Sequence, residues 1–447
     1  MLGSLIFLWS CTTTAPAKQQ PDIILIVIDT LRADRLGIHG HPNSPLSTVD
    51  AIAKEGAWFS RAFAQSGWTL PSFVSMWTGL YPHQHRVGRN PSNKDSFGAL
   101  PTEQTTLAES LQAQGYATGA IINNTFLAPA FGLSQGFDHY DYQGADNSIL
   151  RSADETTQKA LSWIQEQQKP SFLVVHYMEA HMNLMPKKEH RGAYTPSGEP
   201  PVSIPFGGKN AFELTQRQRN QEEIDYVVGL YDEELLAIDT ALRDLVDGLK
   251  KQERWDDALV VITSDHGEEF WEYGSFEHGH SLMGVLTHIP LVIHAPQVQG
   301  KGKIPTLVEH VDLYQGVMSM GGAQKIEGTG GEDIFSLMGE DSFGAERWSI
   351  SENTLYGGPK LSILSPKHRL HFDQKTNVAT VWNLNEEGWE TGVVPEEEQY
   401  SYALPMINVL KTVRGHIAPI DPVTGPNIPD QQVFQQLRSL GYLDKRE

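Results

Sequence analysis

Short, continuously apolar runs separated by longer segments of mixed polarity characterise the first 300 residues of the chain. Ile23–Ile28 and Leu259–Ile262 contain only aliphatic residues, most of them β-branched, and Phe172–Val175 is similarly apolar. Runs of this length and composition are typical of strands buried on both faces of a parallel sheet. The segment 222–251 has the apolar spacing of a long amphipathic helix, which we expect to cover one sheet face. The pattern predicts an α/β fold.

The pattern changes after about residue 325. Three consecutive runs separated by turn-forming residues predict a small antiparallel sheet, formed by Lys360–Leu364, His368–Phe372 and Val378–Trp382. Residues 431–443 carry apolar side chains at helical spacing and predict a terminal helix. We therefore expect three regions, namely an N-terminal signal and tether (1–20), a large α/β domain (21–325) and a C-terminal α+β subdomain (326–447).

Aspartates follow two of the predicted strands. Asp29 ends the first run, and Asp265, with His266 beside it, lies just beyond Leu259–Ile262. Because open α/β sheets bind ligands at the carboxyl ends of their strands, we expect both carboxylates at one edge of the sheet. Carboxylate oxygens and a neutral imidazole suit a divalent cation such as Ca, Mg, Mn or Zn. An aspartate at a strand end is usually only a turn former, so the neighbouring motifs decide between the two interpretations.

Five motifs in sequence order resemble those of sulfatases and related members of the alkaline phosphatase superfamily. They are Ile28–Gly37, Thr69–Gly79, Gly115–Thr118, Ser264–Glu268 and His278–His280 followed by Ile289–Leu291. The resemblance covers residues 21 to about 320, and the order of five motifs makes it specific. It implies a large, mostly parallel sheet sandwiched by helices, and a single metal ion held by Asp29, Thr69, Asp265 and His266.

The nucleophile signature departs from that of sulfatases at two positions. Thr69 stands where sulfatases have a Cys or Ser that becomes formylglycine, and Phe73 replaces the arginine that supports this residue. Threonine cannot form formylglycine, but its hydroxyl can attack phosphorus once a bound cation lowers its pKa. Threonine is also the nucleophile in phosphodiesterase and phosphoethanolamine-transferase branches of the superfamily. Pro71 and Gly79 further predict a short helix after Thr69 whose first amides point at a bound anion.

Histidines are the candidate groups for contacting the substrate. The segment from His176 to His181 resembles a family motif whose second histidine touches the substrate oxyanion, which indicates His181. His280 is a candidate for the same contact or for protonating the leaving group. His278 either orients His280 or is exposed. The irregular, Pro- and Gly-rich segment 183–222 begins directly after His181; its position favours a substrate-selecting lid, although its composition equally allows disorder.

The second family signature continues differently in this chain. Asn123, Asn124 and Thr125 stand where the family has Lys followed by His. These side chains could hydrogen-bond a phosphoryl oxygen, but they make this part of the site less positive. The Asp-x-x-x-His element of the dinuclear branches is not apparent, which favours one metal ion over two.

The motifs together predict a metal-dependent hydrolase that cleaves an anionic ester, a phosphodiester or phosphonate, through Thr69. Two alternatives keep the site, namely a sulfuric-ester hydrolase and a transferase that moves a phospho-headgroup to an alcohol. A threonine sulfate has no elimination route for its release, which disfavours the first of these. A third alternative is a non-catalytic surface lipoprotein that binds anionic glycans.

Charge and cysteine content bear on partners and location. Lys plus Arg number 34 and Asp plus Glu number 55, and the resulting net charge of −21 argues against a nucleic-acid partner. The single cysteine, Cys11, ends the stretch Leu8–Cys11, which resembles a bacterial lipobox. We expect an exported, periplasmic or cell-surface lipoprotein anchored to the membrane through Cys11. No Lys or Arg precedes the short apolar stretch, so a free cysteine is the alternative. The oligomeric state is left open.

Overall fold

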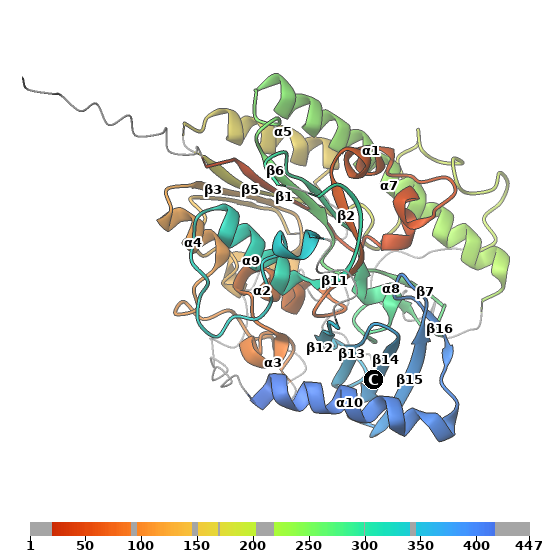
Figure 1. Ribbon diagram of the computed structural model, residues 1–447. Helices are drawn as coiled ribbons and strands as arrows, with labels where there is room; N and C mark the ends of the chain where they lie inside the picture. Colours follow the sequence, from red (N-terminus) through yellow and green to blue (C-terminus); the bar gives the residue numbers. More distant parts are fainter. Residues whose placement is uncertain are drawn as a thin grey trace, which may run out of the picture.

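The computed structural model describes residues 20–90, 96–144, 151–168, 170–202, 219–298, 300–339 and 346–415. Helices cover both faces of a large central sheet, and a smaller sheet lies beside it with a helix on its outer side (Figure 1). The predicted terminal helix at 431–443 and the predicted lipidation site Cys11 lie outside the described residues.

Nine strands form the central sheet. In sheet order they are β11 (Gly302–Glu309), β2 (Ala57–Phe63), β10 (Leu291–His294), β6 (Leu259–Thr263), β1 (Ile23–Ile28), β5 (Ser171–Tyr177), β3 (Ala117–Ile122) and β4 (His139–Tyr142), with β9 (His288–Ile289) paired to β2. Only the pairs that involve β9 or β10 are antiparallel. The predicted mostly parallel sheet is confirmed.

The register of the central strands brings distant parts of the sequence to one edge. In β1, Val27 pairs with His176 of β5 on one side and with Thr263 of β6 on the other. Asp29 follows directly, and its backbone N–H donates to the Tyr177 carbonyl at 2.9 Å. The carboxyl ends of three strands therefore lie together, although more than 200 residues separate β1 from β6.

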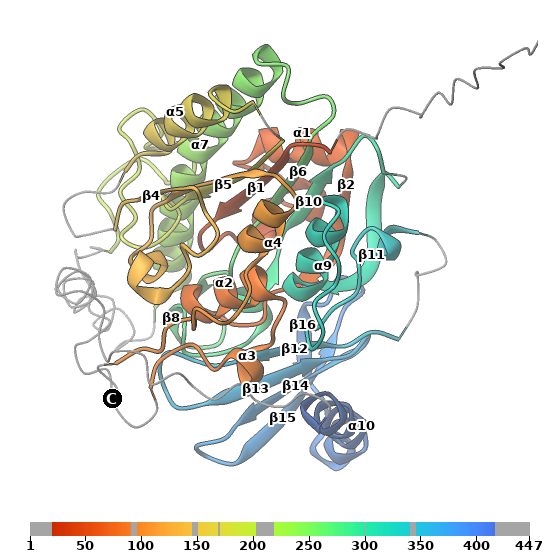
Figure 2. The same ribbon diagram turned by 90° about the vertical axis from the view of Figure 1, so that its left-hand side faces the viewer.

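Alternate residues of β1 face two different cores. Ile23, Leu25 and Val27 pack with one set of helices, and the intervening isoleucines pack with another. The helices of the first core are α2 (Thr69–Thr78), α4 (Leu107–Ala113) and α9 (His310–Met320). Those of the second are α1 (Ser47–Glu55), α5 (Ala153–Gln165) and α7 (Gln221–Lys251). Figure 2 shows the two sets on opposite sides of the sheet.

The long helix α7 confirms the predicted amphipathic segment. Asn220 caps it by accepting a hydrogen bond from the Glu223 N–H at 2.9 Å, and the Glu223 carboxylate accepts one from the Asn220 N–H. Its apolar stripe is fully buried against the sheet. Truncating one of these side chains, for example Leu242→Ala, would cost about 2–5 kcal/mol of stability.

The second sheet has five antiparallel strands. They are β12 (Ser349–Glu352), β13 (Lys360–Leu364), β14 (His368–Asp373), β15 (Val378–Leu384) and β16 (Glu390–Val393), in this order. The three predicted strands are confirmed, and α10 (Glu396–Gly415) packs on them through Ala403, Met406 and Leu410. Buried Arg369 of β14 donates to the Leu282 carbonyl at 2.7 Å, which ties the smaller sheet to the segment that follows the His278–His280 motif. The domain boundary near residue 325 stays a prediction.

Short elements complete the described fold. They are α3 (Pro82–His85), α8 (Gly284–Thr287), the hairpin of β7 (Glu269–Phe270) and β8 (Phe276–Glu277), and the 3-10 turns η1 (Ala33–Arg35), η2 (Gly37–His39), η3 (Thr125–Leu127), η4 (Pro129–Phe131) and η5 (Ser336–Met338). Within the described ranges, no helix is both long and apolar enough to cross a membrane.

The described part of the irregular insertion, residues 183–202, has no helix or strand but is held by α7. One carboxylate oxygen of the fully buried Glu233 accepts hydrogen bonds from the backbone N–H groups of Gly192, Tyr194 and Thr195, at 2.8 to 3.1 Å. It also accepts one from the Thr195 hydroxyl at 2.6 Å. These bonds tie residues 192–195 to α7, whereas the predicted role of the insertion as a lid stays a prediction.

Candidate metal and nucleophile site

Asp29, Asp265 and His266 converge at the carboxyl edge of the central sheet. All three are fully buried, and one ligand atom from each lies within 4.8 Å of the others. His266 Nε2 lies 3.3 Å from Asp265 Oδ2 and 3.8 Å from Asp29 Oδ1. The structure thus brings together three of the four residues that the sequence indicated as metal ligands.

The turn after Asp29 fixes one oxygen of Asp265. Thr30 adopts a φ of 58°, a left-handed conformation that β-branched residues rarely adopt and that is often found at functional sites. The backbone N–H groups of Thr30 and His266 donate to Asp265 Oδ1 at 3.3 and 3.0 Å. The other oxygen, Oδ2, is therefore left facing His266.

Unpartnered oxygens at this point fit a cation. Asp29 Oδ1 and Asp265 Oδ2 are buried, and the described residues give neither of them a hydrogen-bond donor. The His266 ring donates from Nδ1 to the Gly267 carbonyl at 2.9 Å, which leaves the lone pair of Nε2 toward the carboxylates. Buried acceptors without donors are costly, and two carboxylates with an imidazole nitrogen are ligands that a divalent ion accepts.

The two carboxyl groups differ in acidity. Burial and then the negative charge of Asp29 raise the pKa of Asp265 well above its usual range. Burial alone would raise the pKa of Asp29 as well, but a hydrogen bond from His176 and the charges of the nearby histidines outweigh it and lower that pKa. Burial lowers the pKa of His266 to about 4, so its imidazole is neutral at pH 7. A bound cation would stabilise both carboxylates in their ionised forms.

Thr69 is the first residue of α2 and lies beside the cluster. Its side chain is 1% exposed, and Oγ1 lies 3.3 Å from His266 Nε2. The predicted helix is confirmed, and it ends at Gly79, whose φ of 67° is left-handed. The Ser72 hydroxyl donates to the Asp265 carbonyl at 2.5 Å and ties the first turn of α2 to the end of β6. The nucleophile position is thus held against the metal-ligand cluster.

Of the three side chains predicted to contact a phosphoryl group, Asn124 is the one that faces Thr69. Its Nδ2 donates to Asp29 Oδ2 at 2.6 Å and to Thr69 Oγ1 at 3.3 Å. Asn123 points elsewhere, since its Nδ2 donates to Thr156 and to the His176 carbonyl, and its Oδ1 accepts from Arg151. Thr125 is buried at the start of η3. The amide of Asn123 instead bonds to residues of α5 and β5, so a phosphoryl contact by Asn123 stays a prediction that these bonds do not favour.

In the His278–His280 segment, His278 and not His280 lies against the cluster, and His278 is buried rather than exposed. The His278 ring centroid lies 4.6 Å from that of His266 and 4.9 Å from that of His181. His280 Nε2 instead lies 2.8 Å from Glu269 Oε2 in the small hairpin. Glu277 and Gly279 both have left-handed φ angles, 65° and 80°, so the chain reverses around His278. The spacing of the motif could not show which ring faces the cluster.

Two buried side chains at the site were not singled out from the sequence. Glu268 Oε1 lies 3.0 Å from His278 Nδ1 and orients that ring. His176 Nε2 lies 3.3 Å from Asp29 Oδ2. The available signal for His176 was a polar residue inside an otherwise apolar strand that is buried on both faces.

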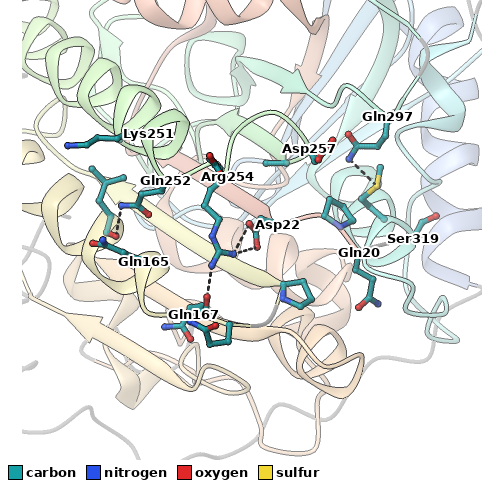
Figure 3. A pocket seen from close by; sticks show the side chains of 18 of the residues that line it. Gln20, Asp22, Gln165, Gln167, Lys251, Gln252, Arg254, Asp257, Gln297 and Ser319 are labelled. Carbon is teal, nitrogen blue, oxygen red and sulfur yellow. Dashed lines mark hydrogen bonds and ion pairs between the residues drawn. The ribbon is translucent and has the colours of Figure 1, made fainter. Parts of the chain in front are cut away.

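A separate open groove lies at the opposite edge of the central sheet (Figure 3). Its volume is about 1390 Å³, and residues just before β1, β5 and β6 line it, including Asp22, Pro170 and Ala258. Glutamines supply much of its polar lining, and Arg254 there pairs with Asp22 at 3.0 Å. The groove shares no residue with the cluster at the carboxyl edge.

Sequence comparisons match most of the chain to sulfatases. The sulfatase family profile matches residues 21–323. The uncharacterized sulfatase YidJ of Escherichia coli strain K12 is 22% identical over 369 residues, which are 71% of each chain. The extracellular sulfatase SULF-1 homolog of Drosophila melanogaster is 22% identical over 74% of this chain, but that match spans only 32% of the fly protein.

Solved structures with a similar fold include a sulfatase and a phosphonate monoester hydrolase. A phosphonate monoester hydrolase from Silicibacter pomeroyi matches with a TM-score of 0.68 at 18% identity, over 89% of this chain and 95% of that one. A 2-O GAG sulfatase matches with a TM-score of 0.71 at 17% identity, over 88% and 91% of the two chains. At these identities the structures establish the fold, and the profile, which covers more than half of the chain, establishes the family. The protein belongs to the sulfatase family, whose members are hydrolases of the alkaline phosphatase superfamily.

Proposed function

We propose that the protein is a metal-dependent hydrolase that cleaves a phosphoester, either a diester or a phosphonate ester, with Thr69 as its nucleophile. One observation carries the proposal: the Thr69 hydroxyl lies 3.3 Å from His266 Nε2, beside carboxylate oxygens to which no described residue donates. Family membership supports ester hydrolysis, and threonine at the nucleophile position supports phosphorus over sulfur as the centre attacked.

Asp29, Asp265 and His266, together with Thr69, would hold one divalent ion of Ca, Mg, Mn or Zn. When bound, such an ion supplies Lewis-acid chemistry, because it lowers the pKa of a hydroxyl and stabilises developing negative charge on a phosphoryl oxygen. The buried oxygens of the two aspartates, unpartnered within the described chain, are the structural support for this assignment.

The residues of the site suit a two-step reaction. Thr69 Oγ1 attacks phosphorus as its proton passes to solvent, the bond from phosphorus to the leaving alcohol breaks with its electron pair going to the alcohol oxygen, and a phosphothreonine forms. Water then attacks the same phosphorus and releases Thr69. The Asn124 amide and the free N–H groups at the start of α2 can hydrogen-bond the phosphoryl oxygens as negative charge develops on them.

Two histidines are placed to assist departure of the alcohol. His278 is oriented by Glu268, and its ring packs against both His266 and His181. A proton from either imidazole to the leaving oxygen would avoid expulsion of an unstable alkoxide. In this assignment His278 takes the role that the sequence gave to His280, and His181 keeps its role as a substrate contact.

The polarity of the site favours a singly charged substrate. The Phe73 ring packs edge-on against His176 and Trp77, and Asn124 is neutral. The resemblance to sulfatases implies cationic side chains at or near these two positions. A phosphodiester or phosphonate ester, with one negative charge, therefore suits the site better than a phosphate monoester with two.

Turnover of matched nitrophenyl substrates tests the proposal. Phosphate monoester, phosphate diester, phosphonate ester and sulfate ester would be compared, with Ca, Mg, Mn and Zn supplied separately. Thr69→Val keeps the shape of the side chain and removes the hydroxyl, so it should abolish diester or phosphonate turnover. Thr69→Ser keeps a hydroxyl and is the matched control, in which measurable turnover should persist.

The same measurement separates the alternatives. Sulfate turnover without phosphoester turnover would replace our assignment by sulfuric-ester hydrolysis, which the family as a whole supports. Metal binding without turnover of any of the four esters would instead favour a phospho-headgroup transferase or an anion-binding protein. Equal turnover by Thr69→Val and the unaltered protein would eliminate Thr69 as the nucleophile.

We also propose that the chain is exported and anchored to a membrane by a lipid on Cys11. The support is the lipobox-like stretch Leu8–Cys11 and the single occurrence of cysteine in the sequence. Fractionation of bacterial cells that express the protein or Cys11→Ser tests this. The unaltered protein should sediment with membranes, and the variant should not; identical distributions would contradict the anchor.

A further inference from the structure

His176 is a polar residue at a position where the fold requires an apolar one. In β5, Phe172 and Val174 face the core that contains α2, whereas Leu173, Val175 and Tyr177 face the opposite core. By this alternation His176 points toward α2, and Phe73 of α2 packs edge-on against its ring with centroids 5.5 Å apart. The residue is fully buried. Burying an imidazole here costs free energy that a leucine or valine would not.

The polar contact that offsets this cost is Asp29. His176 Nε2 lies 3.3 Å from Asp29 Oδ2, a close polar contact, and the described residues offer neither ring nitrogen any other polar partner. Val27 pairs with His176 across the two strands, so the first residue beyond β1 on the same face is Asp29. Strand register alone therefore aims the ring at the carboxylate.

The two oxygens of Asp29 have different environments. Oδ2 accepts the hydrogen bond from Asn124 Nδ2 at 2.6 Å and lies next to His176 Nε2. Oδ1 receives no hydrogen bond from the part of the chain that the structure describes, and it lies 3.8 Å from His266 Nε2. The Asn124 donor and the His176 ring both lie at Oδ2, which leaves Oδ1 on the side of His266.

We propose that His176 is a positioning residue for the metal site, which donates from Nε2 to Asp29 Oδ2 and thereby keeps Asp29 Oδ1 directed at the cation. This inference rests on the proposed metal site and names the residue that orders one of its ligands. Rotation of a carboxylate about its last side-chain bond is only weakly restricted by the bond itself. Neighbouring donors must therefore hold the orientation, and removing such a partner costs about 10- to 100-fold in metal affinity.

A pair of amide substitutions tests the direction of the hydrogen bond. The side-chain nitrogen of glutamine reaches about as far as Nε2 of histidine, whereas that of asparagine ends near the position of Nδ1. His176→Gln should therefore bind metal nearly as well as the unaltered protein. His176→Asn should bind about 10- to 100-fold more weakly. Because both variants bury one amide at the same place, a general loss of packing affects them alike.

Metal affinity would be measured with the full chain, without substrate. Titration with Mn²⁺, followed by the free-ion electron paramagnetic resonance signal, gives the dissociation constant directly, and Zn²⁺ would be measured by competition with a chelator. Melting temperatures of the metal-free variants show whether each variant is folded. Turnover is not needed for any of these readouts.

His288 supplies the matched control. It is also fully buried, its Nε2 lies 3.0 Å from the Ser60 carbonyl, and its ring contacts Phe63 and Trp389 rather than the cluster. His288→Gln and His288→Asn should leave both dissociation constants unchanged. Equal affinities of His176→Gln and His176→Asn, or the same loss in the His288 pair, would overturn the inference. An unaltered protein that binds neither ion would overturn the metal site itself.

Discussion

Two pairs of buried acidic side chains in this molecule have opposite surroundings. At the carboxyl edge of the central sheet, Asp29 and Asp265 each leave one oxygen to which none of the described residues donates. Where the central sheet meets the smaller sheet, Glu309 and Asp312 are equally buried, but donors surround them. Tyr81, Gln65 and the Ile350 N–H donate to Glu309 at 2.7 to 2.8 Å.

Both carboxylate oxygens of Asp312 also accept hydrogen bonds. Its Oδ2 accepts from Arg347 and from the Glu309 N–H, both at 2.8 Å, and its Oδ1 accepts from the Glu332 N–H at 2.7 Å. A buried carboxylate with donors on both oxygens has its lone pairs satisfied by hydrogen bonds within the protein. Asp29 and Asp265 each keep one buried oxygen that receives no hydrogen bond from the described residues, and a bound cation would satisfy both oxygens. The contrast supports our proposal that the first pair binds a cation, whereas the second pair is hydrogen-bonded within the protein.

The largest expected effect follows from neutralising the first pair. Asp265→Asn keeps the acceptor for the Thr30 and His266 N–H groups but removes the ionisable oxygen that faces the cation. Turnover should fall by about a thousandfold, or ~4 kcal/mol of activation free energy. The melting temperature of the metal-free variant should be close to that of the unaltered protein, because the raised pKa of Asp265 favours its neutral form and asparagine accepts the same backbone hydrogen bonds. A lower melting temperature with normal turnover would assign Asp265 a structural role.

The corresponding substitution in the Glu309–Asp312 pair should lower stability and leave metal binding unchanged. Asp312→Asn leaves the half-buried Arg347 guanidinium with only the exposed Glu332 as an anionic partner, which is expected to lower the free energy of unfolding by about 2 kcal/mol. Metal affinity should stay unchanged. Urea denaturation and Mn²⁺ titration of the same sample check both statements, and a large change in affinity would show that the two pairs are coupled.

Metal binding should stabilise the protein against unfolding only when Asp29 and Asp265 are both present. A divalent ion at about 100 times its dissociation constant should raise the free energy of unfolding by roughly 2.7 kcal/mol, because the ion binds the folded state alone. The increase should be absent in Asp265→Asn and preserved in Asp312→Asn. Thermal unfolding with and without a chelator measures it. Stabilisation of Asp265→Asn by the ion would place the metal elsewhere.

A smaller effect is expected at Glu234, a buried carboxyl of α7 that accepts a backbone hydrogen bond. The Met185 N–H donates to it, and burial raises its pKa to about 8. In the folded protein this group keeps its proton between pH 4.5 and 8, whereas the unfolded chain loses it, so stability falls as the pH rises through this range. Glu234→Gln should remove this loss, giving a gain on the order of 2 kcal/mol at pH 9 and none near pH 4.

The exposed Glu222 on the same helix provides the control for this prediction. Glu222→Gln should leave the dependence of stability on pH unchanged, since the side chain is in water in both states. Urea denaturation at several pH values between 4 and 9 compares the two variants. Parallel curves for Glu234→Gln and the unaltered protein would mean that Glu234 is ionised at no cost in the folded state.

Periodicity and turn residues in the sequence determined most of the architecture. The aliphatic runs at Ile23–Ile28 and Leu259–Ile262 predicted strands buried on two faces, and both lie in the middle of the sheet. The end of each run placed Asp29 and Asp265 at the same edge, because neighbouring parallel strands end together. The position of Thr69 also followed from local signals, since Pro71 and Gly79 delimit the helix that presents it.

Tertiary structure decided the orientation of side chains in the irregular segments and the identity of the groups around the ligands. Left-handed residues on both sides of His278 turn that ring, and not His280, toward His266, and no periodic pattern encodes such a reversal. Asn123 and Asn124 are adjacent in sequence, yet only the second reaches Thr69, because Arg151 and Thr156 hold the first. His176 meets Asp29 only through the register of β1 and β5. Strand periodicity is a local property of the chain, whereas these contacts depend on where non-adjacent segments meet.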